Sequence, residues 1–186
     1  MSNYLIPLMV VVPMLCAILV NAFAKFNKSI KVLTFVVAIC LPIIPLLSNY
    51  GLHFFGGYTP MLDNATGVIY HPAITYAFDM LQQIFIAAVG LITFLVAFIY
   101  LSKYKKASGQ YLFLLFMGTA SVTALMLTDD IFNMFVFFEI LALVQVGIVI
   151  ASPMDYSYEM ALKYMILGSI GSPIMLLGIG FLLAST

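Results

Sequence analysis

The sequence predicts an all-α integral membrane protein with six transmembrane helices. Hydrophobic residues make up 65% of the chain, charged residues only 8%, and the mean hydropathy is +1.18. Soluble domains carry roughly 25% charged residues. The apolar residues also gather in windows of about 20 residues, the length of a helix that crosses a bilayer. An open sheet would leave unpaired edge groups in lipid, and the sequence lacks the alternating pattern of a membrane β-barrel.

A single transmembrane domain is expected over residues 1–186. Its predicted helices are residues 4–24, 32–48, 77–102, 111–127, 131–151 and 159–183, with an external loop at 49–76. The first apolar window has neither the positive flank nor the cleavage site of a signal peptide, so we expect it to remain as a helix. Lysines precede the second and fourth windows, aspartates precede the third and fifth, and Glu159 opens the sixth.

Prolines and small residues inside the windows predict local irregularities. Pro7 and Pro13 could kink the first helix, and Pro42 and Pro45 could bend or end the second. In the sixth helix, the small residues of segment 168–173 favour close packing against another helix. A hydrated kink beside a conduction path is the alternative interpretation.

The lysines predict the orientation in the membrane. The connections after the first, third and fifth helices carry or lead to every lysine, whereas the other connections carry only aspartates as charges. These lysines are Lys25, Lys28, Lys31, Lys103, Lys105, Lys106 and Lys163. By the positive-inside rule, we expect both termini outside and the lysine-bearing connections in the cytoplasm. The expected membrane is the inner, cytoplasmic membrane of the cell.

The external loop and the cysteines suggest no metal site. Glycines, prolines and aromatic runs in residues 49–76 favour a structured hairpin. His53 and His71 lie there without clustered acids or cysteines, so surface histidines are expected. Cys16 and Cys40 are expected to be small apolar fillers. We expect no metal, no cofactor and, at a net charge of zero, no nucleic acid partner.

Glu139 is the main candidate for function. It lies nine residues after Asp130, about 13 Å deeper along a helix, which is near the middle of a hydrocarbon layer ~30 Å thick. A carboxylate at that depth costs at least ~2.5 kcal/mol and is functional by default. Desolvation raises the pKa of such a group and a nearby ammonium lowers it, so a moving neighbour can change its protonation. A permanent ion pair that locks helix packing is the alternative.

Other polar residues near these helices have simpler expected roles. Asp129 and Asp130 precede the fifth helix, where one of them is expected to cap the first turn, and ion entry is a secondary role. Lys163 lies four residues after Glu159, which fits equally a boundary salt bridge and a relay base. Asn133 and Gln145 each lie ~120° around the helix from Glu139. We expect packing hydrogen bonds from both.

Segment 130–140, with its run of phenylalanines ending in Glu139, resembles the fifth helix of the antiporter-like subunits of complex I and of Mrp-type cation/proton antiporters. Segment 161–168 resembles the start of their sixth helix. Gly67-Val68 followed by Asp79-Met80-Leu81 resembles their external loop running into the third helix. Related subunits occur in membrane-bound hydrogenase-type complexes. The resemblance covers nearly the whole chain.

The resemblance implies a membrane subunit that translocates H⁺ or Na⁺ within a multi-subunit complex, with Glu139 and Lys163 as the translocating residues. In that family the glutamate pairs with a lysine on a broken seventh helix, and about fourteen helices form two inverted repeats. The present sequence predicts six. Glu139 is therefore expected to need a partner from a neighbouring membrane chain or from Lys163.

The sequence is compatible with two functions. One is the transport subunit that the resemblance implies, and the other is a structural subunit that packs and seals the complex without conducting. An independent membrane enzyme has little support, because the predicted spans hold no Ser/His/Asp set, metal cluster or phosphate-binding glycine loop.

Overall fold

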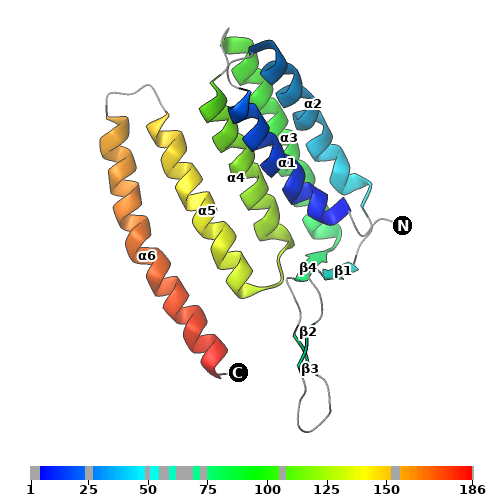
Figure 1. Ribbon diagram of the computed structural model, residues 1–186, viewed down its shortest axis with the longest axis vertical. Helices are drawn as coiled ribbons and strands as arrows, with labels where there is room; N and C mark the ends of the chain where they lie inside the picture. Colours follow the sequence, from blue (N-terminus) through cyan, green and yellow to red (C-terminus); the bar gives the residue numbers. More distant parts are fainter. Residues whose placement is uncertain are drawn as a thin grey trace.

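Figure 1 shows the computed structural model of the protein. It describes residues 5–23, 27–48, 51–54, 59–61, 69–71, 75–104, 108–151 and 156–185. The helices in this part of the chain are α1 (Leu5–Ala22), α2 (Asn27–Leu46), α3 (Met80–Lys103), α4 (Gly109–Leu127), α5 (Ile131–Ile150) and α6 (Ser157–Ser185). The strands are β1 (Gly51–Phe54), β2 (Thr59–Met61), β3 (Ile69–His71) and β4 (Thr75–Phe78).

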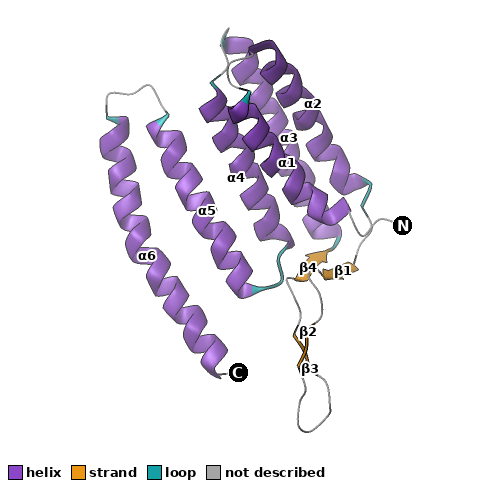
Figure 2. Cartoon of the chain, in the orientation of Figure 1, coloured by secondary structure: helices purple, strands orange, loops and turns teal. Residues whose placement is uncertain are grey.

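The first four helices pack around one another, and the last two are added on one side (Figure 2). Helix α1 contacts both α2 and α4, and α3 contacts both α2 and α4. Helix α5 packs on α4, and α6 packs on α5. Consecutive helices run in opposite directions, as is usual in helical bundles (Figure 1). Helices α5 and α6 therefore form a layer of their own beside the group of four.

Two apolar clusters hold the group of four together. The cluster nearer the α1–α2 and α3–α4 connections is formed by Cys16, Ala17, Val20, Ile30, Ala38, Leu41, Ala97, Leu112 and Phe116. The cluster nearer β4 is formed by Ile6, Met9, Val10, Tyr76, Phe78, Ile86, Ala124 and Leu127. Cys16 acts as the predicted apolar filler in the first cluster, whereas Cys40 is exposed on α2. A hydrogen bond of 2.9 Å between the Thr93 and Thr119 hydroxyls joins α3 to α4.

Glycines allow close approach where helices meet. A Cβ atom built on Gly90 of α3 would lie 2.7 Å from the backbone nitrogen of Pro42 in α2. Helix α2 continues through Pro42 and Pro45 to Leu46, so neither proline ends it at its own position. On α5, a Cβ built on Gly147 would lie 2.7 Å from a methyl group of Leu114. Small residues therefore set the spacing of these two helix pairs.

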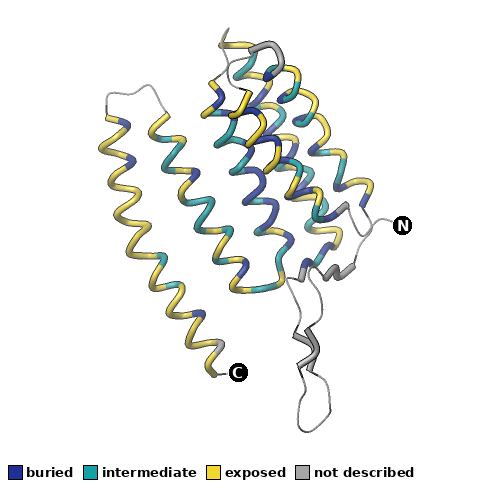
Figure 3. Tube along the Cα trace, viewed as in Figure 1, coloured by how far each residue is buried: buried dark blue, intermediate teal, exposed yellow. Residues whose placement is uncertain are grey.

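Helix α6 is exposed along nearly all of its length (Figure 3). Built Cβ atoms on Gly168 and Gly171 meet no atom within 4 Å, so the predicted close packing of segment 168–173 does not occur between the described parts of this chain. Four stretches are long and apolar enough to cross a membrane, namely Met80–Lys103, Gly109–Leu127, Ile131–Ile150 and Ser157–Leu182. The stretches in α1 and α2 are shorter, so the predicted count of six spans stays a prediction.

Some helix boundaries differ from the predicted ones. Helix α2 begins at Asn27 rather than at residue 32, because charged residues in a terminal turn can lie outside the hydrocarbon layer. Helix α3 begins at Met80 rather than at residue 77, since Ala77 and Phe78 pair with β1 instead. The backbone nitrogen of Asp79 donates to Gln82 Oε1 at 3.1 Å and marks the start of α3.

The predicted external loop contains two antiparallel strand pairs. Strand β1 pairs with β4 in the register Gly51 to Phe78, and β2 pairs with β3 in the register Thr59 to His71. An isolated bridge joins Tyr76 of β4 to Thr128, just before α5. Residues 62–68 and the side chains of the two histidines in the loop lie outside the described part. The hairpin therefore attaches to the bundle where α4 passes into α5.

The end of α1, the start of α2, the end of α3 and the start of α4 lie at one end of the bundle, opposite the strands (Figure 1). Lys31 Nζ donates to the backbone oxygen of Tyr104 at 3.2 Å and joins the start of α2 to the end of α3. Lys25, Lys105 and Lys106 lie outside the described residues. We call this end of the bundle the lysine end and the opposite end, where the strands lie, the hairpin end.

Candidate functional site

Glu139 lies halfway along α5 on the side that faces α6. The side chain is partly buried and lines a cavity of about 370 Å³ between the two helices. Its neighbours on α5 are Ala142 and Val146, which share its helical face as the spacing predicts. From α6, Gly168 lines the same cavity. The Glu139 carboxyl therefore faces a cavity between two helices.

Three further polar residues line this cavity, namely Gln145, Tyr164 and Ser169. Gln145, for which the sequence predicts a packing hydrogen bond, lines the same cavity as Glu139 although it lies ~120° around the helix from it. Helical angle alone missed this residue, and only the position of α6 brings it in. Ser169 Oγ donates to the Ile166 oxygen at 2.8 Å.

A second cavity continues the first toward the lysine end. It has a volume of about 280 Å³ and is lined by Gln145, Ile148, Val149 and Tyr164. Gln145 and Tyr164 belong to both cavities. These two side chains thus stand between the space around Glu139 and the last turn of α5.

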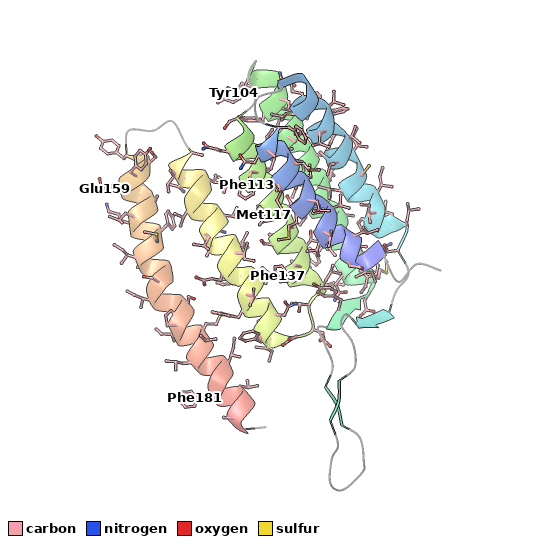
Figure 4. All side chains as sticks on the ribbon, viewed as in Figure 1. Tyr104, Phe113, Met117, Phe137, Glu159 and Phe181 are labelled. Atoms are coloured by element: carbon pink, nitrogen blue, oxygen red, sulfur yellow. The ribbon has the colours of Figure 1, made fainter. Side chains whose placement is uncertain are left out.

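Lys163 does not line either cavity. Its Nζ lies 2.7 Å from Glu159 Oε1, and the two side chains are 63% and 61% exposed, which is the boundary salt bridge of the two predicted alternatives. Five residues separate Lys163 from Gly168, about 7.5 Å along the axis of α6. The structure therefore does not bring Lys163 together with Glu139. Figure 4 places Glu159 near the lysine end of α6.

At the hairpin end, Asp130 caps α5. Its Oδ1 accepts from the Phe132 backbone nitrogen at 2.9 Å. Asp129 is exposed beside it. A carboxylate at a helix N-terminus also complements the positive end of the helix dipole. Both acids lie at the outer end of the helix that carries Glu139.

The hairpin is tied to the first turn of α5 by a small polar network. Asn133 is buried and its Nδ2 donates to Thr128 Oγ1 at 2.9 Å. Its side chain also forms a hydrogen bond with that of Tyr76 from β4. Burial raises the pKa of the Tyr76 phenol, and the bond with Asn133 lowers it by less. Asn133 thus makes the packing hydrogen bonds that the sequence predicts and takes no part in the cavity around Glu139.

The arrangement suits binding and release of a proton by a carboxyl group. No lysine or histidine from the described residues lines the cavity around Glu139. The described residues also contain no group of three or more His, Cys, Asp or Glu that could hold a metal ion. Glu139 is therefore the single ionisable group on the described walls of its cavity apart from the Tyr164 phenol.

No protein-family model matches the sequence. Several individual proteins are similar to it in sequence. An uncharacterised protein of Methanocaldococcus jannaschii is 40% identical over 184 residues, which is 99% of this chain and 37% of that protein. A Na⁺/H⁺ antiporter subunit of Bacillus subtilis is 31% identical over 100 residues, or 54% of this chain and 20% of the relative. The corresponding subunit of Alkalihalophilus pseudofirmus is 22% identical over 184 residues, or 99% and 37%.

Among solved structures, the membrane-bound sulfane sulfur reductase, an archaeal respiratory membrane complex, contains a chain with the same fold. The TM-score is 0.76 at 23% identity, over 97% of this chain and 37% of the other. The chain thus spans about a third of the length of several relatives that it matches. The predicted resemblance to antiporter-like membrane subunits is confirmed.

Proposed function

We propose that this homologue of Na⁺/H⁺ antiporter subunits is a membrane subunit of a multi-subunit complex that translocates ions. The ion is H⁺, Na⁺ or both in exchange. The support comes from relatives that are named Na⁺/H⁺ antiporter subunits. All six helices cross an inner, cytoplasmic membrane in this proposal. The two lysine-bearing connections, after α1 and after α3, and Lys163 near the start of α6 support a cytoplasmic location for that end of the bundle, with both termini outside.

The observation that carries the proposal is the position of Glu139. A carboxyl group in the middle of a membrane is costly unless it faces a partner or a hydrated space. Glu139 faces a cavity of about 370 Å³, large enough for several water molecules and lined in part by polar groups. In the proposal the carboxyl takes up a proton from one side and releases it to the other.

Gln145 and Tyr164 supply the next step toward the lysine end. They line both the cavity around Glu139 and the cavity that follows it. An amide and a phenol can each accept and donate hydrogen bonds to water. We expect a chain of waters along these side chains to carry the proton between Glu139 and the cytoplasmic side. On the opposite side, exposed Asp129 and capping Asp130 are the candidate entry groups.

Lys163 enters the proposal through its pair with Glu159. An exposed ion pair contributes little to stability, so its geometry rearranges readily. Released from Glu159, the ammonium of a flexible lysine side chain can turn toward the cavity, whose lining on α6 begins at the next residue, Tyr164. Its charge would then lower the proton affinity of Glu139 and favour release. In the observed arrangement the pair is closed and the lysine is held at the boundary.

Other membrane subunits complete the proposed path. Helix α6 exposes most of its apolar residues, and the cavity around Glu139 holds no basic group from the described residues. We propose that a neighbouring membrane segment packs beside α6 and provides a lysine near Glu139, with lipid covering the remaining surface. The competing proposal is a subunit that only packs and seals, which the long exposed faces also fit.

The test is Glu139→Gln in the assembled complex, reconstituted in proteoliposomes with a fluorescent pH indicator. The amide has the same size but binds no transferable proton. We expect loss of coupled proton movement with unchanged subunit content on native gels. Glu139→Asp is the matched variant and should keep partial activity. Full proton movement with Glu139→Gln would establish the packing-only subunit instead, and Na⁺ movement without proton movement would replace H⁺ as the ion.

A further inference from the structure

A cavity of about 670 Å³ lies at the lysine end of the bundle, away from Glu139. It is enclosed by the last turns of α3 and α5 and the first turn of α4. Its lining residues are Val96, Ile99, Tyr100, Lys103, Tyr104, Ser108, Gln110, Tyr111, Ile148 and Ala151. Its volume lies within the ~300–1,000 Å³ range of small-molecule sites. The proposed proton path uses none of these residues except Ile148.

Three neighbouring tyrosines form one wall of this cavity, with Tyr100 stacked on Tyr111 and tilted against Tyr104. The rings of Tyr100 and Tyr111 lie 4.3 Å apart between centroids at an interplanar angle of 23°, and those of Tyr100 and Tyr104 lie 4.9 Å apart. The Tyr100 hydroxyl accepts from the Ser108 backbone nitrogen at 2.9 Å, which fixes the ring. Tyrosines are enriched where a membrane helix meets the lipid headgroups. The wall is therefore a rigid aromatic surface at headgroup depth.

The described residues that line the cavity carry a positive charge. Lys103 lines it, and its Nζ lies 5.8 Å from the centre of the Tyr104 ring. Lys31 approaches from α2 and donates to the Tyr104 backbone oxygen. None of the described lining residues carries a carboxylate. The polar groups near Lys103, namely Ser108 and Gln110, can donate hydrogen bonds to an anion.

An apolar groove continues from this cavity toward the middle of the bundle. It has a volume of about 240 Å³ and runs between α3, α4 and α5. Ile148 lines both spaces. On α3, Ile92 in the groove and Val96 and Ile99 in the cavity follow one another at helical spacing on one face. The cavity that holds Lys103 and the apolar groove thus adjoin each other at Ile148.

We infer that this cavity and groove bind one anionic phospholipid from the cytoplasmic leaflet. The phosphate lies beside Lys103 and the polar rim, and an acyl chain extends along the groove. The inference rests on two features of the site: a lysine and tyrosines suit an acidic headgroup, and the adjoining apolar groove suits an acyl chain. Basic pockets between transmembrane helices on the cytoplasmic side bind acidic lipid headgroups. The inference is independent of the role of Glu139.

The test is lipid binding to the full chain, purified in detergent and measured by native mass spectrometry. Phosphatidylglycerol and phosphatidylcholine are titrated separately. We expect tighter binding of phosphatidylglycerol, and about five-fold weaker binding of it by Lys103→Gln, the effect of one lysine near a membrane surface. Lys163→Gln removes a lysine at the same end outside the cavity and is the control. It should bind phosphatidylglycerol as the unchanged chain does.

A second pair of variants tests the apolar wall of the cavity. Ile99 is 61% exposed and lines the cavity, so Ile99→Trp should fill part of it and weaken phosphatidylglycerol binding. Leu95 is 48% exposed on the same helix outside the cavity, and Leu95→Trp should leave binding unchanged. Equal affinity for the two lipids, or unchanged binding by a folded Lys103→Gln protein, overturns the inference. Displacement of the lipid by equimolar inorganic phosphate would do the same, since it would show a simple anion site.

Discussion

The contact between α3 and α2 at Gly90 gives a stability prediction whose size follows from the structure. A Cβ on this residue would lie 2.7 Å from the Pro42 nitrogen, 2.9 Å from the Leu41 carbonyl carbon and 3.0 Å from the Pro42 Cα. All three are backbone atoms, so no side-chain rotation relieves the overlap. Ordinary contact begins at 3.4 Å, and the two helices would have to separate by about 0.7 Å in Gly90→Ala.

Overpacking of this kind costs ~3 kcal/mol at the upper end of the usual range. The better helix propensity of alanine returns up to ~1 kcal/mol. We therefore expect Gly90→Ala to lower the free energy of unfolding by about 2 kcal/mol, measured by denaturant titration in detergent with helical circular dichroism as the signal. Gly171→Ala is the matched control, because its Cβ meets no atom within 4 Å and it should be neutral or slightly stabilising. Equal stability of the two variants would refute the close approach of α3 to α2.

Three further predictions concern polar contacts, each measured by the same unfolding titration. Asp130→Ala removes the cap of α5 and should cost ~1 kcal/mol, whereas Asp129→Ala should cost less, and equal losses would contradict the capping role. Thr119→Val should cost only ~0.6 kcal/mol, because the remaining Thr93 hydroxyl still donates to its own helix at the Val89 oxygen, and a loss of several kcal/mol would count against this account. Burial raises the folded-state pKa of Tyr76 above the ordinary 10.0, so the neutral phenol stabilises the fold below pH ~10 and this contribution is lost as the pH rises through the folded pKa. Tyr76→Phe should lose some stability at pH 8 but should lack that extra alkaline loss, and an unchanged alkaline slope would exclude Tyr76 as its source.

The sequence was sufficient to predict the helical membrane fold, because the signal lies in composition and in the length of apolar windows. The choice of Glu139 as the candidate residue rests on the same signal, since an acid stands out within an apolar span, and the structure places it on the wall of a cavity. The helix boundary at Met80 was not. Ala77 and Phe78 are apolar and continue the window, and only pairing with β1 shows that they form a strand. Such pairing depends on residues about 25 positions away in the chain.

The composition of the cavity was less predictable than its central acid. Gln145 lies ~120° around α5 from Glu139, and it joins the cavity only because of where α6 packs. For Lys163, the spacing to Glu159 fits two geometries, and sequence offers no way to choose between them. The structure shows the salt bridge between Lys163 and Glu159, and both side chains are exposed on the surface of the chain. Sequence thus identifies the costly residue, while helix packing determines its neighbours.

The central claim is that Glu139 changes its protonation state while the complex works. Infrared difference spectroscopy of the reconstituted complex, recorded between resting and energised states, measures this directly through the C=O stretch of a protonated carboxyl. We predict a carboxyl band that appears in the unchanged protein, shifts in Glu139→Asp and is absent in Glu139→Gln. A band that persists undiminished in Glu139→Gln, or no carboxyl change in the unchanged protein during active proton movement, would contradict the account.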